Sequence, residues 1–253
     1  MMDDESYDFW RPLIALGISF CGTSLVCELL HHWNPEWYQK RQLVYPTDKK
    51  DKQRQHTSLS IIVLFNVSLS AILLVGLWKW RLSYVETHSL NISNLLFWLP
   101  DTLGLTTEVS SWRKALRFPI DFFALEKISQ FWFFHMHWLV HKFPVVYAIV
   151  HKWHHQYREP SALTAIDCTV WEMLLLNLPA VGLGPLLVLP HPTVHLIWCV
   201  ATGIYTPVVH SGYNLIPFFN PRYHDEHHRN PTCNFGSPML DRWYGTNSHQ
   251  AKE

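Results

Sequence analysis

Residues 59–78 read LSIIVLFNVSLSAILLVGLW, an apolar run without a charged side chain. About 20 helical residues cross a bilayer core of roughly 30 Å, so this stretch predicts a membrane span. A weaker candidate, Pro119–Trp138, is interrupted by three charged residues. Three further runs share the apolar character: Leu13–Leu30, Val170–Leu189 and Thr193–Val209. We therefore expect an all-α, multi-span membrane protein with four or five membrane segments.

The composition agrees with a membrane protein. Hydrophobic residues make up 48% of the chain and charged residues 16%, and there are 13 tryptophans, which are enriched at membrane interfaces. The formal net charge is zero, with 20 basic and 20 acidic residues. Because nucleic-acid binding draws on an excess of basic charge, no nucleic-acid partner is expected.

The basic residues predict the orientation in the membrane. The loop between the first two spans contains six of them: Lys40, Arg41, Lys49, Lys50, Lys52 and Arg54. The positive-inside rule places this loop in the cytosol. Alternate crossings then leave residues 79–118 in the lumen, with a sequon at Asn91, and turn the chain between the last two spans at Pro190-His191-Pro192.

Three tight histidine clusters all fall on the predicted cytosolic side. They are His137-x3-His141, His151-x2-His154-His155 and His224-x2-His227-His228. Residues three and four apart share one face of a helix, so each cluster directs its imidazoles to one region. Eight nitrogen ligands exceed the four of a tetrahedral zinc and suit two metal ions. Imidazole binds iron, copper, nickel and zinc alike, so the ligand type leaves the metal open.

Simpler interpretations exist for each cluster taken alone. A single His-x3-His beside a membrane helix is more often an interfacial pair than a metal site. A zinc protease is excluded because no His-Glu-x-x-His occurs, and the His224-Asp-Glu-His227 spacing differs from it. Three clusters on one side of one membrane favour a metal site over interfacial packing.

The clusters resemble the histidine boxes of the fatty acid hydroxylase / sterol desaturase superfamily of membrane di-iron enzymes. The boxes read HWLVHKFP at 137–144, HKWHHQ at 151–156 and HDEHH at 224–228. A family signature, HSGYN at 210–214, precedes the third box, and CNFG at 233–236 and DRWYGT at 241–246 match the closing pattern. VWE at 170–172 follows the second box as in cholesterol 25-hydroxylases, to which the motifs are most similar.

The resemblance implies a set of catalytic and iron-binding residues. Eight box histidines would ligate two irons and serve catalysis: His137, His141, His151, His154, His155, His224, His227 and His228. His210 would be the ninth ligand. Thr206 stands where some relatives carry a further histidine, so a tenth ligand is not expected there. Val208 and Val209 replace an acidic residue, and residues 210–224 form a shorter stretch than in 25-hydroxylases, so the substrate pocket is expected to differ.

The resemblance also implies an activity. It is O2-dependent hydroxylation of a sterol side chain in the endoplasmic reticulum membrane. Because no Gly-x-Gly-x-x-Gly occurs, electrons from NAD(P)H would arrive through a separate protein, cytochrome b5 or a flavoprotein reductase. The alternatives are sterol C4-methyl oxidation, sterol desaturation, fatty acyl or sphingoid hydroxylation, and a non-catalytic metal-binding scaffold. Residues 1–117 would form an N-terminal anchoring region and residues 118–250 the catalytic region.

A few polar residues near the clusters have open roles. Asn234 is a candidate for supporting a ligand by hydrogen bonding, and Glu172 is either such a support or a helix-end carboxylate. His135 points off the face of its cluster and is expected to be interfacial or supporting. Because histidine ligands must be neutral and a free histidine has a pKa of about 6.5, acid is expected to strip metal below about pH 6.

Overall fold

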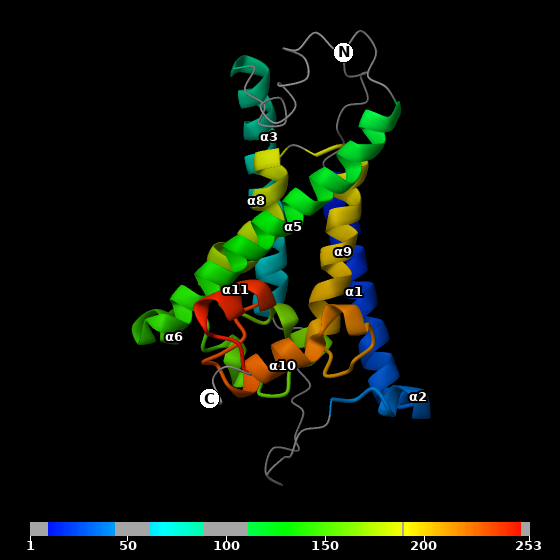
Figure 1. The fold of residues 1–253 in the computed structure, drawn as a ribbon, viewed down its shortest axis with the longest axis vertical. Helices are drawn as coiled ribbons and strands as arrows, with labels where there is room; N and C mark the ends of the chain where they lie inside the picture. Colours follow the sequence, from blue (N-terminus) through cyan, green and yellow to red (C-terminus); the bar gives the residue numbers. More distant parts are fainter. Residues whose placement is uncertain (1–9, 44–60, 89–110, 189, 249–253) are drawn as a thin grey trace.

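The computed structural model describes residues 10–43, 61–88, 111–188 and 190–248 (Figure 1). Within these ranges the regular structure is helical, and extended backbone pairs at one bridge, between Gln42 and Tyr213. The expected all-α class is therefore confirmed.

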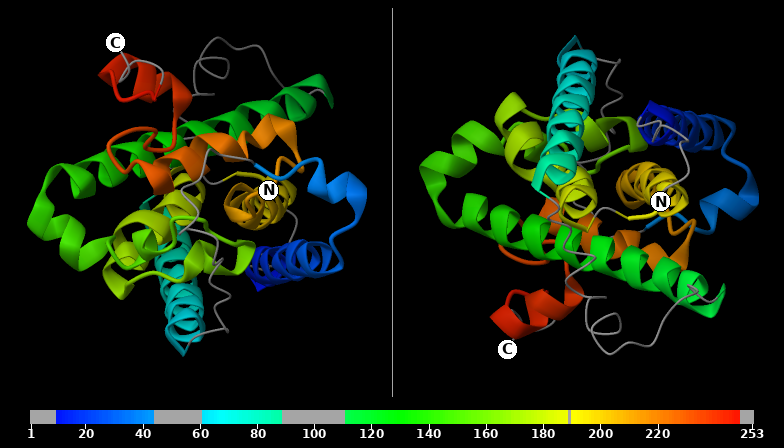
Figure 2. Two further views of the ribbon diagram at one scale, coloured as in Figure 1. Left: turned by 90° about the horizontal axis from the view of Figure 1, so that it is seen from below. Right: turned by 90° about the horizontal axis from the view of Figure 1, so that it is seen from above.

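Five long helices build the body of the molecule, and shorter helices cover one end (Figures 1 and 2). The long helices are α1 (Trp10–Trp33), α3 (Ile61–His88), α5 (Ser111–Lys142), α8 (Leu178–Val188) and α9 (Pro192–His210). The shorter α-helices are α2 (Glu36–Gln39), α6 (Pro144–Val150), α7 (Val170–Glu172), α10 (Pro221–Arg229) and α11 (Pro238–Tyr244). Single turns of other helix types are η1 (His154–Gln156), η2 (Ala162–Ile166), η3 (Met173–Asn177) and η4 (Pro217–Phe219).

Three helical stretches in the described ranges are long and apolar enough to cross a membrane. They are Arg11–Trp33, Val170–Val188 and Pro192–His210. The helix α3 carries a shorter apolar stretch, Phe65–Leu77, and α5 continues through Pro119 as one helix with charged residues in it. The protein is a membrane protein, and three of the five expected segments qualify on length and composition.

Close approach of α1 and α9 depends on a glycine. A Cβ atom added at Gly203 of α9 would lie 2.0 Å from the Ser19 hydroxyl and 2.9 Å from the Leu16 carbonyl oxygen of α1. Small residues at such a crossing let two helix backbones approach in an apolar environment, where packing rather than water exclusion drives association. The two helices therefore form a tight pair beside the rest of the bundle (Figure 1).

A buried amide joins α3 to the segment before α7. Asn66 is fully buried, and its side-chain nitrogen donates to the Cys168 carbonyl oxygen at 2.8 Å. Asn66 also belongs to an Asn-Val-Ser triplet, but its side chain is buried and its amide nitrogen is engaged in this bond. The sequon at Asn91 and the basic positions 49–54 lie outside the described residues.

The segment leading into α8 contains a π-helical turn, η3. In a π-turn the usual i→i−4 ladder is interrupted, which leaves a carbonyl group for another partner. The Leu175 carbonyl oxygen accepts from the Trp132 indole of α5 at 2.9 Å. Just before it, the Thr169 hydroxyl caps α7 by accepting from the Glu172 amide and donates to the Val150 carbonyl oxygen. These bonds fix Glu172 beside the second histidine cluster.

All three histidine clusters lie at one end of the bundle (Figure 1). The chain runs toward this end along α1, α5 and α9 and away from it along α3 and α8, and α10 lies across it. The first cluster closes α5, the second follows α6, and the third occupies α10. The alternating direction of the helices therefore brings together motifs that are far apart in sequence.

Candidate metal centre

Nine histidines converge in two buried groups. Within each group, one ring nitrogen from every member lies within 4.8 Å of the others. The five-histidine group contains His137, His141, His151, His155 and His227. The four-histidine group contains His154, His210, His224 and His228. The structure thus brings together all eight box histidines and His210, and it divides them into two possible metal positions.

The division cuts across the sequence clusters. On α10, His224 and His228 are one turn apart and face the four-histidine group, whereas His227 faces the five-histidine group. At the end of α6, His151 and His155 enter the five-histidine group, and His154 turns toward the other. Histidines four positions apart enter the same group, whereas histidines three positions apart enter different groups. The expectation that each cluster serves one region is therefore wrong for the second and third clusters, and one short segment supplies ligands to both positions.

Burial keeps these imidazoles neutral. His151 and His227 are 2% and 0% exposed. Burial lowers the pKa of His151, His154 and His227 to about 3 in each case. For His154 the effect of burial is opposed by the nearby Glu172, which raises the pKa. A neutral ring has a lone pair for a metal, so this environment suits metal ligation.

Backbone carbonyl groups set the orientation of two rings in the five-histidine group. The His137 Nδ1 lies 3.0 Å from the Phe235 carbonyl oxygen, and the His227 Nδ1 lies 2.6 Å from the Cys233 carbonyl oxygen. A carbonyl oxygen only accepts, so each Nδ1 must carry the proton. The Nε2 atom of each ring then presents its lone pair to the centre of the group.

The four-histidine group is oriented in the same way by other carbonyl groups. The His210 Nδ1 donates to the Thr206 carbonyl oxygen at 2.8 Å, one turn earlier in α9. The His228 Nδ1 donates to the Tyr157 carbonyl oxygen at 2.9 Å. Such second partners of ligating histidines fix the tautomer and the ring direction at metal sites.

The distances between converging nitrogens fit a shared metal ion. Nε2–Nε2 separations are 2.9 Å for His137 with His151 and 3.0 Å for His155 with His227. In the other group they span 2.8 to 3.4 Å among His154, His210, His224 and His228. Two nitrogens about 2.1 Å from one metal ion lie roughly 3.0 Å apart at a right angle and roughly 3.4 Å apart at a tetrahedral angle. The donor sets therefore fit two metal ions.

Several ring nitrogens in the groups are buried without a hydrogen-bond partner. These are the Nε2 of His141 and the Nδ1 of His154 and His155. Leaving a buried polar atom unpaired costs about 1–3 kcal/mol, and either ring nitrogen of histidine is able to bind a metal. His141 lies within the five-histidine group, where a bound metal ion would satisfy its unpaired nitrogen.

Glu172 lies against a box histidine, whereas Asn234 belongs to a loop that holds two of them. A carboxylate oxygen of Glu172, which is 2% exposed, lies 2.7 Å from the His151 Nδ1. The side-chain amide of Asn234 donates instead to the Tyr223 carbonyl oxygen and to Glu226. Asn234 has a positive φ of 59° between the two residues whose carbonyls hold His227 and His137. It therefore shapes the supporting loop.

The other histidines near the clusters stand outside both groups. His135 bonds to the Phe131 carbonyl oxygen and to the Tyr244 hydroxyl, which agrees with the expected supporting or interfacial position. His191 caps α9 by accepting from the Thr193 amide. No individual sequence signal marks the carbonyl partners Thr206 and Tyr157, because every residue carries a carbonyl group and only the fold decides which one faces a histidine.

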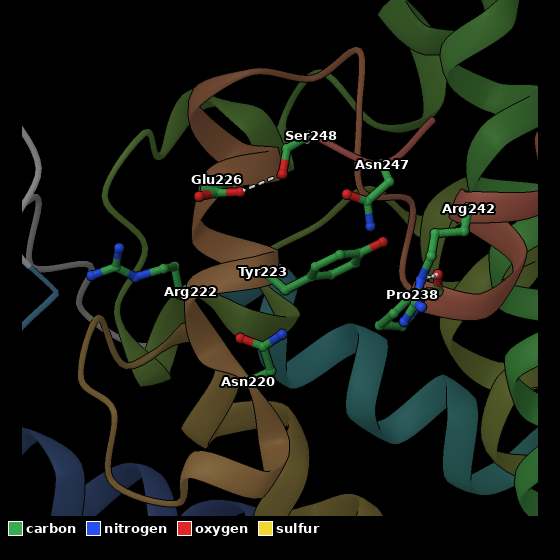
Figure 3. A pocket seen from close by; sticks show the side chains of 8 residues that line it. All are labelled: Asn220, Arg222, Tyr223, Glu226, Pro238, Arg242, Asn247 and Ser248. Carbon is green, nitrogen blue, oxygen red and sulfur yellow. Dashed lines mark hydrogen bonds between the residues drawn. The ribbon is translucent and has the colours of Figure 1, made fainter. Parts of the chain in front are cut away.

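A pocket of about 480 Å³ lies between α10 and α11, on a different face of α10 from the histidines (Figure 3). Figure 3 shows Tyr223 reaching from α10 toward Pro238 and Arg242 of α11, and the Ser248 hydroxyl donating to Glu226. The lining residues are Asn220, Arg222, Tyr223, Glu226, Pro238, Arg242, Asn247 and Ser248.

Comparison with known families agrees with this geometry. Residues 122–246 match the family model described as fatty acid hydroxylase. This region, about half of the chain, is similar to the fatty acid hydroxylase superfamily. The family match begins in α5 and includes both histidine groups, which agrees with the expectation of a histidine-rich di-metal site of this family.

Individual relatives carry several different names. The chain is 33% identical over 150 residues to methylsterol monooxygenase erg25A of Aspergillus fumigatus, covering 54% of this chain and 45% of the relative. It is 31% identical over 123 residues to human fatty acid hydroxylase domain-containing protein 2, covering 48% and 36%. It is 30% identical over 166 residues to very-long-chain aldehyde decarbonylase GL1-8 of Oryza sativa subsp. indica, covering 59% of each.

These matches refine the sequence-based expectation. The aligned part spans about half or less of the first two relatives and 59% of the third. No solved structure gives a significant match. Methylsterol monooxygenases from fungus, rat and chicken are among the similar proteins. The likeness to cholesterol 25-hydroxylases in particular is therefore not supported, because a short motif such as VWE at 170–172 resembles one subgroup without fixing the substrate pocket.

Proposed function

We propose that this protein is an O2-dependent, membrane-bound di-iron monooxygenase that oxidises a methyl group of a sterol or a closely related lipid. The observation that carries the proposal is the convergence of nine buried or half-buried histidines in two groups at one end of a membrane helix bundle. Similarity to methylsterol monooxygenases supports the sterol methyl group as the position of oxidation.

The nine histidines are proposed as the metal ligands, five for one iron and four for the other. Two iron ions bound there would supply the reductive activation of O2 that oxidation of an unactivated C–H bond requires. The residues of the chain prepare the site for them. Phe235 and Cys233 hold the protons of His137 and His227 at Nδ1, so that Nε2 stays available for ligation.

Aromatic side chains shield the five-histidine group from water. The ring centroid of Phe133 lies 5.1 Å from that of His137, and the centroid of Phe235 lies 5.3 Å from that of His141. An apolar wall beside the ligands lowers the local dielectric and keeps the imidazoles neutral. It also offers a surface that a lipid substrate can contact, which supports a hydrophobic substrate.

Electrons are proposed to come from NAD(P)H through cytochrome b5 or a flavoprotein reductase. The chain has no Gly-x-Gly-x-x-Gly motif for a nucleotide of its own. The basic residues before α3 support an orientation with the histidine end in the cytosol, where such a donor would dock. The endoplasmic reticulum membrane is the proposed location.

The test is lipid mass spectrometry under 18O2. Microsomes containing the protein are supplied with NADPH, cytochrome b5, its reductase and a methylsterol, beside a His154→Ala/His155→Ala control. We expect 18O in an alcohol, aldehyde or acid derived from a sterol methyl group, and none from the control, which removes a ligand from each histidine group.

Other results would contradict the proposal in distinct ways. A label on the sterol side chain would restore the 25-hydroxylase assignment. A labelled fatty acyl or sphingoid product would overturn the sterol substrate. An unlabelled product set from protein that holds both irons would overturn the monooxygenase assignment and favour a metal-binding scaffold.

A further inference from the structure

Asp241 is a buried carboxylate that organises the loop after α10. It is 0% exposed and accepts four hydrogen bonds. One oxygen accepts from the Phe235 amide at 2.9 Å and the Thr246 hydroxyl at 2.6 Å. The other accepts from the Ser237 amide at 3.2 Å and the Tyr223 hydroxyl at 2.6 Å. A buried carboxylate is tolerated where its oxygens are satisfied in this way.

The loop that Asp241 holds provides the carbonyl partners of two histidines. Phe235 is bonded on both sides: its amide donates to Asp241, and its carbonyl oxygen accepts from the His137 Nδ1. Two residues earlier, the Cys233 carbonyl oxygen accepts from the His227 Nδ1. Asp241 is thus linked to His137 through a single residue, Phe235. It is linked to His227 through the same short loop, which includes Cys233.

Both of these histidines belong to the five-histidine group. The carbonyl partners in the four-histidine group come from elsewhere, with Thr206 in α9 holding His210 and Tyr157 holding His228. The Tyr223 hydroxyl also ties α10 to Asp241, but the same helix is fixed independently by Arg229, which bonds to Glu159. The support given by Asp241 is therefore directed mainly at one of the two metal positions.

We propose that Asp241 is a positioning residue for the five-histidine metal position, acting by fixing the loop carbonyls that orient His137 and His227. This inference rests on the proposed function in one respect, namely that both groups bind a metal ion. It goes beyond that function by assigning unequal support to the two positions. It makes the retention of one metal depend on a carboxylate that ligates neither.

The experiment compares Asp241→Asn with the wild-type protein. Asparagine keeps the size of the side chain, but its NH2 group places a donor opposite the amide donor of Ser237 or Phe235. Purified, iron-loaded protein is dialysed against a graded series of chelator concentrations, and metal per chain is counted. We expect the variant to release one metal at a chelator concentration 10- to 100-fold lower than the wild type, as for other supporting residues of metal ligands. The second metal should be released as in the wild type.

The control is Asp121→Asn, which changes another buried aspartate, in the first half of α5, whose carboxylate accepts from the His191 amide. It should retain both metals at wild-type chelator concentrations. A milder variant, Thr246→Val, removes one hydroxyl that donates to Asp241 and leaves the carboxylate in place. It should weaken binding of the same metal ion, but by a smaller factor than Asp241→Asn.

Three results would overturn the inference. They are unchanged retention of both metals in Asp241→Asn, equal weakening of both metals there, or, where Asp241→Asn does not fold, unchanged retention in Thr246→Val. Wild-type protein that binds two irons and forms the labelled sterol product upholds the proposed function in every one of these cases, so the two failures are distinguishable.

Discussion

The Nε2 atoms of His137 and His151 face each other at 2.9 Å. On the far side of each ring, the His137 Nδ1 donates to the Phe235 carbonyl oxygen, and the His151 Nδ1 lies 2.7 Å from a Glu172 carboxyl oxygen. The proton at the His137 Nδ1 leaves the Nε2 lone pair of this ring directed at His151. Two nitrogens at this separation fit a shared metal ion, since ligands about 2.1 Å from one ion lie roughly 3.0 Å apart at a right angle.

Replacing Glu172 should weaken the metal of the five-histidine group. Glu172→Ala removes the carboxyl group that lies 2.7 Å from the His151 Nδ1 and is expected to lower metal affinity about 10- to 100-fold. Glu172→Gln retains an acceptor oxygen and should lose less. Competition with a chromophoric chelator measures both. The control, Glu36→Gln, changes an exposed carboxylate of α2 and should leave affinity unchanged. Equal affinity for Glu172→Ala and wild type would show that the 2.7 Å contact is incidental.

The metal-free protein should lose stability as the pH falls from about 6.5. Unfolded histidines have a pKa of about 6.5, whereas burial lowers the pKa of His151, His154 and His227 to about 3 in the folded protein. Between these values the unfolded chain binds more protons, so the free energy of unfolding is complete above pH 6.5 and decreases toward pH 3.

Unfolding curves in detergent at pH 7.5, 6.5, 5.5 and 5.0, with and without metal, test this expectation. The loaded protein should withstand a lower pH because the metal competes with protons for the same nitrogens. The expected loss of metal below about pH 6 then follows from unfolding, since folded ligands with depressed pKa values remain neutral there. A metal-free protein equally stable at pH 5 and pH 7.5 would contradict this account.

Substituting Gly236 should disturb the supporting loop. Its φ is +115°, and an added Cβ would lie 2.8 Å from the ring of Phe133. Gly236→Ala therefore combines backbone strain with a steric clash and is expected to cost about 1–3 kcal/mol of unfolding free energy. Metal content should fall as well, because Phe235 orients His137. Calorimetry and metal analysis report the two effects.

Gly245 provides the matched comparison for this loop. It also has a positive φ, +70°, but no atom lies within 4 Å of its added Cβ. Gly245→Ala should cost only the backbone term of about 1–2 kcal/mol and keep both metals. Equal losses of unfolding free energy and equal metal contents in the two variants would show that the contact with Phe133 does not contribute.

Enlarging Gly203 should separate α1 from α9. The added Cβ of Gly203→Ala would overlap the Ser19 hydroxyl at 2.0 Å, and overpacking of this kind costs about 1–3 kcal/mol. A lower thermal midpoint in detergent should result. Gly22→Ala in α1 places its Cβ in open space and should be close to neutral. Identical midpoints for the two variants would count against close packing of α1 and α9.

Local sequence patterns predicted much of this protein. Apolar runs such as residues 59–78 predicted the helical membrane architecture, because the length needed to cross a bilayer is fixed by helix rise. The spacing of His224, His227 and His228 predicted a shared helix, because residues three and four apart are neighbours on its surface. The chemistry of imidazole then predicted a two-metal site, and the motifs identified the superfamily.

The tertiary structure alone decided how the histidines divide and what holds them. His154 and His155 are neighbours in the sequence, yet they enter different groups, because the turn after α6 directs adjacent side chains apart. Asp241 contacts Phe235, and Glu172 contacts His151. No sequence motif predicts either contact. Spacing along one helix follows from local backbone geometry, whereas the partner of a buried nitrogen depends on which loop the packed helices bring against it.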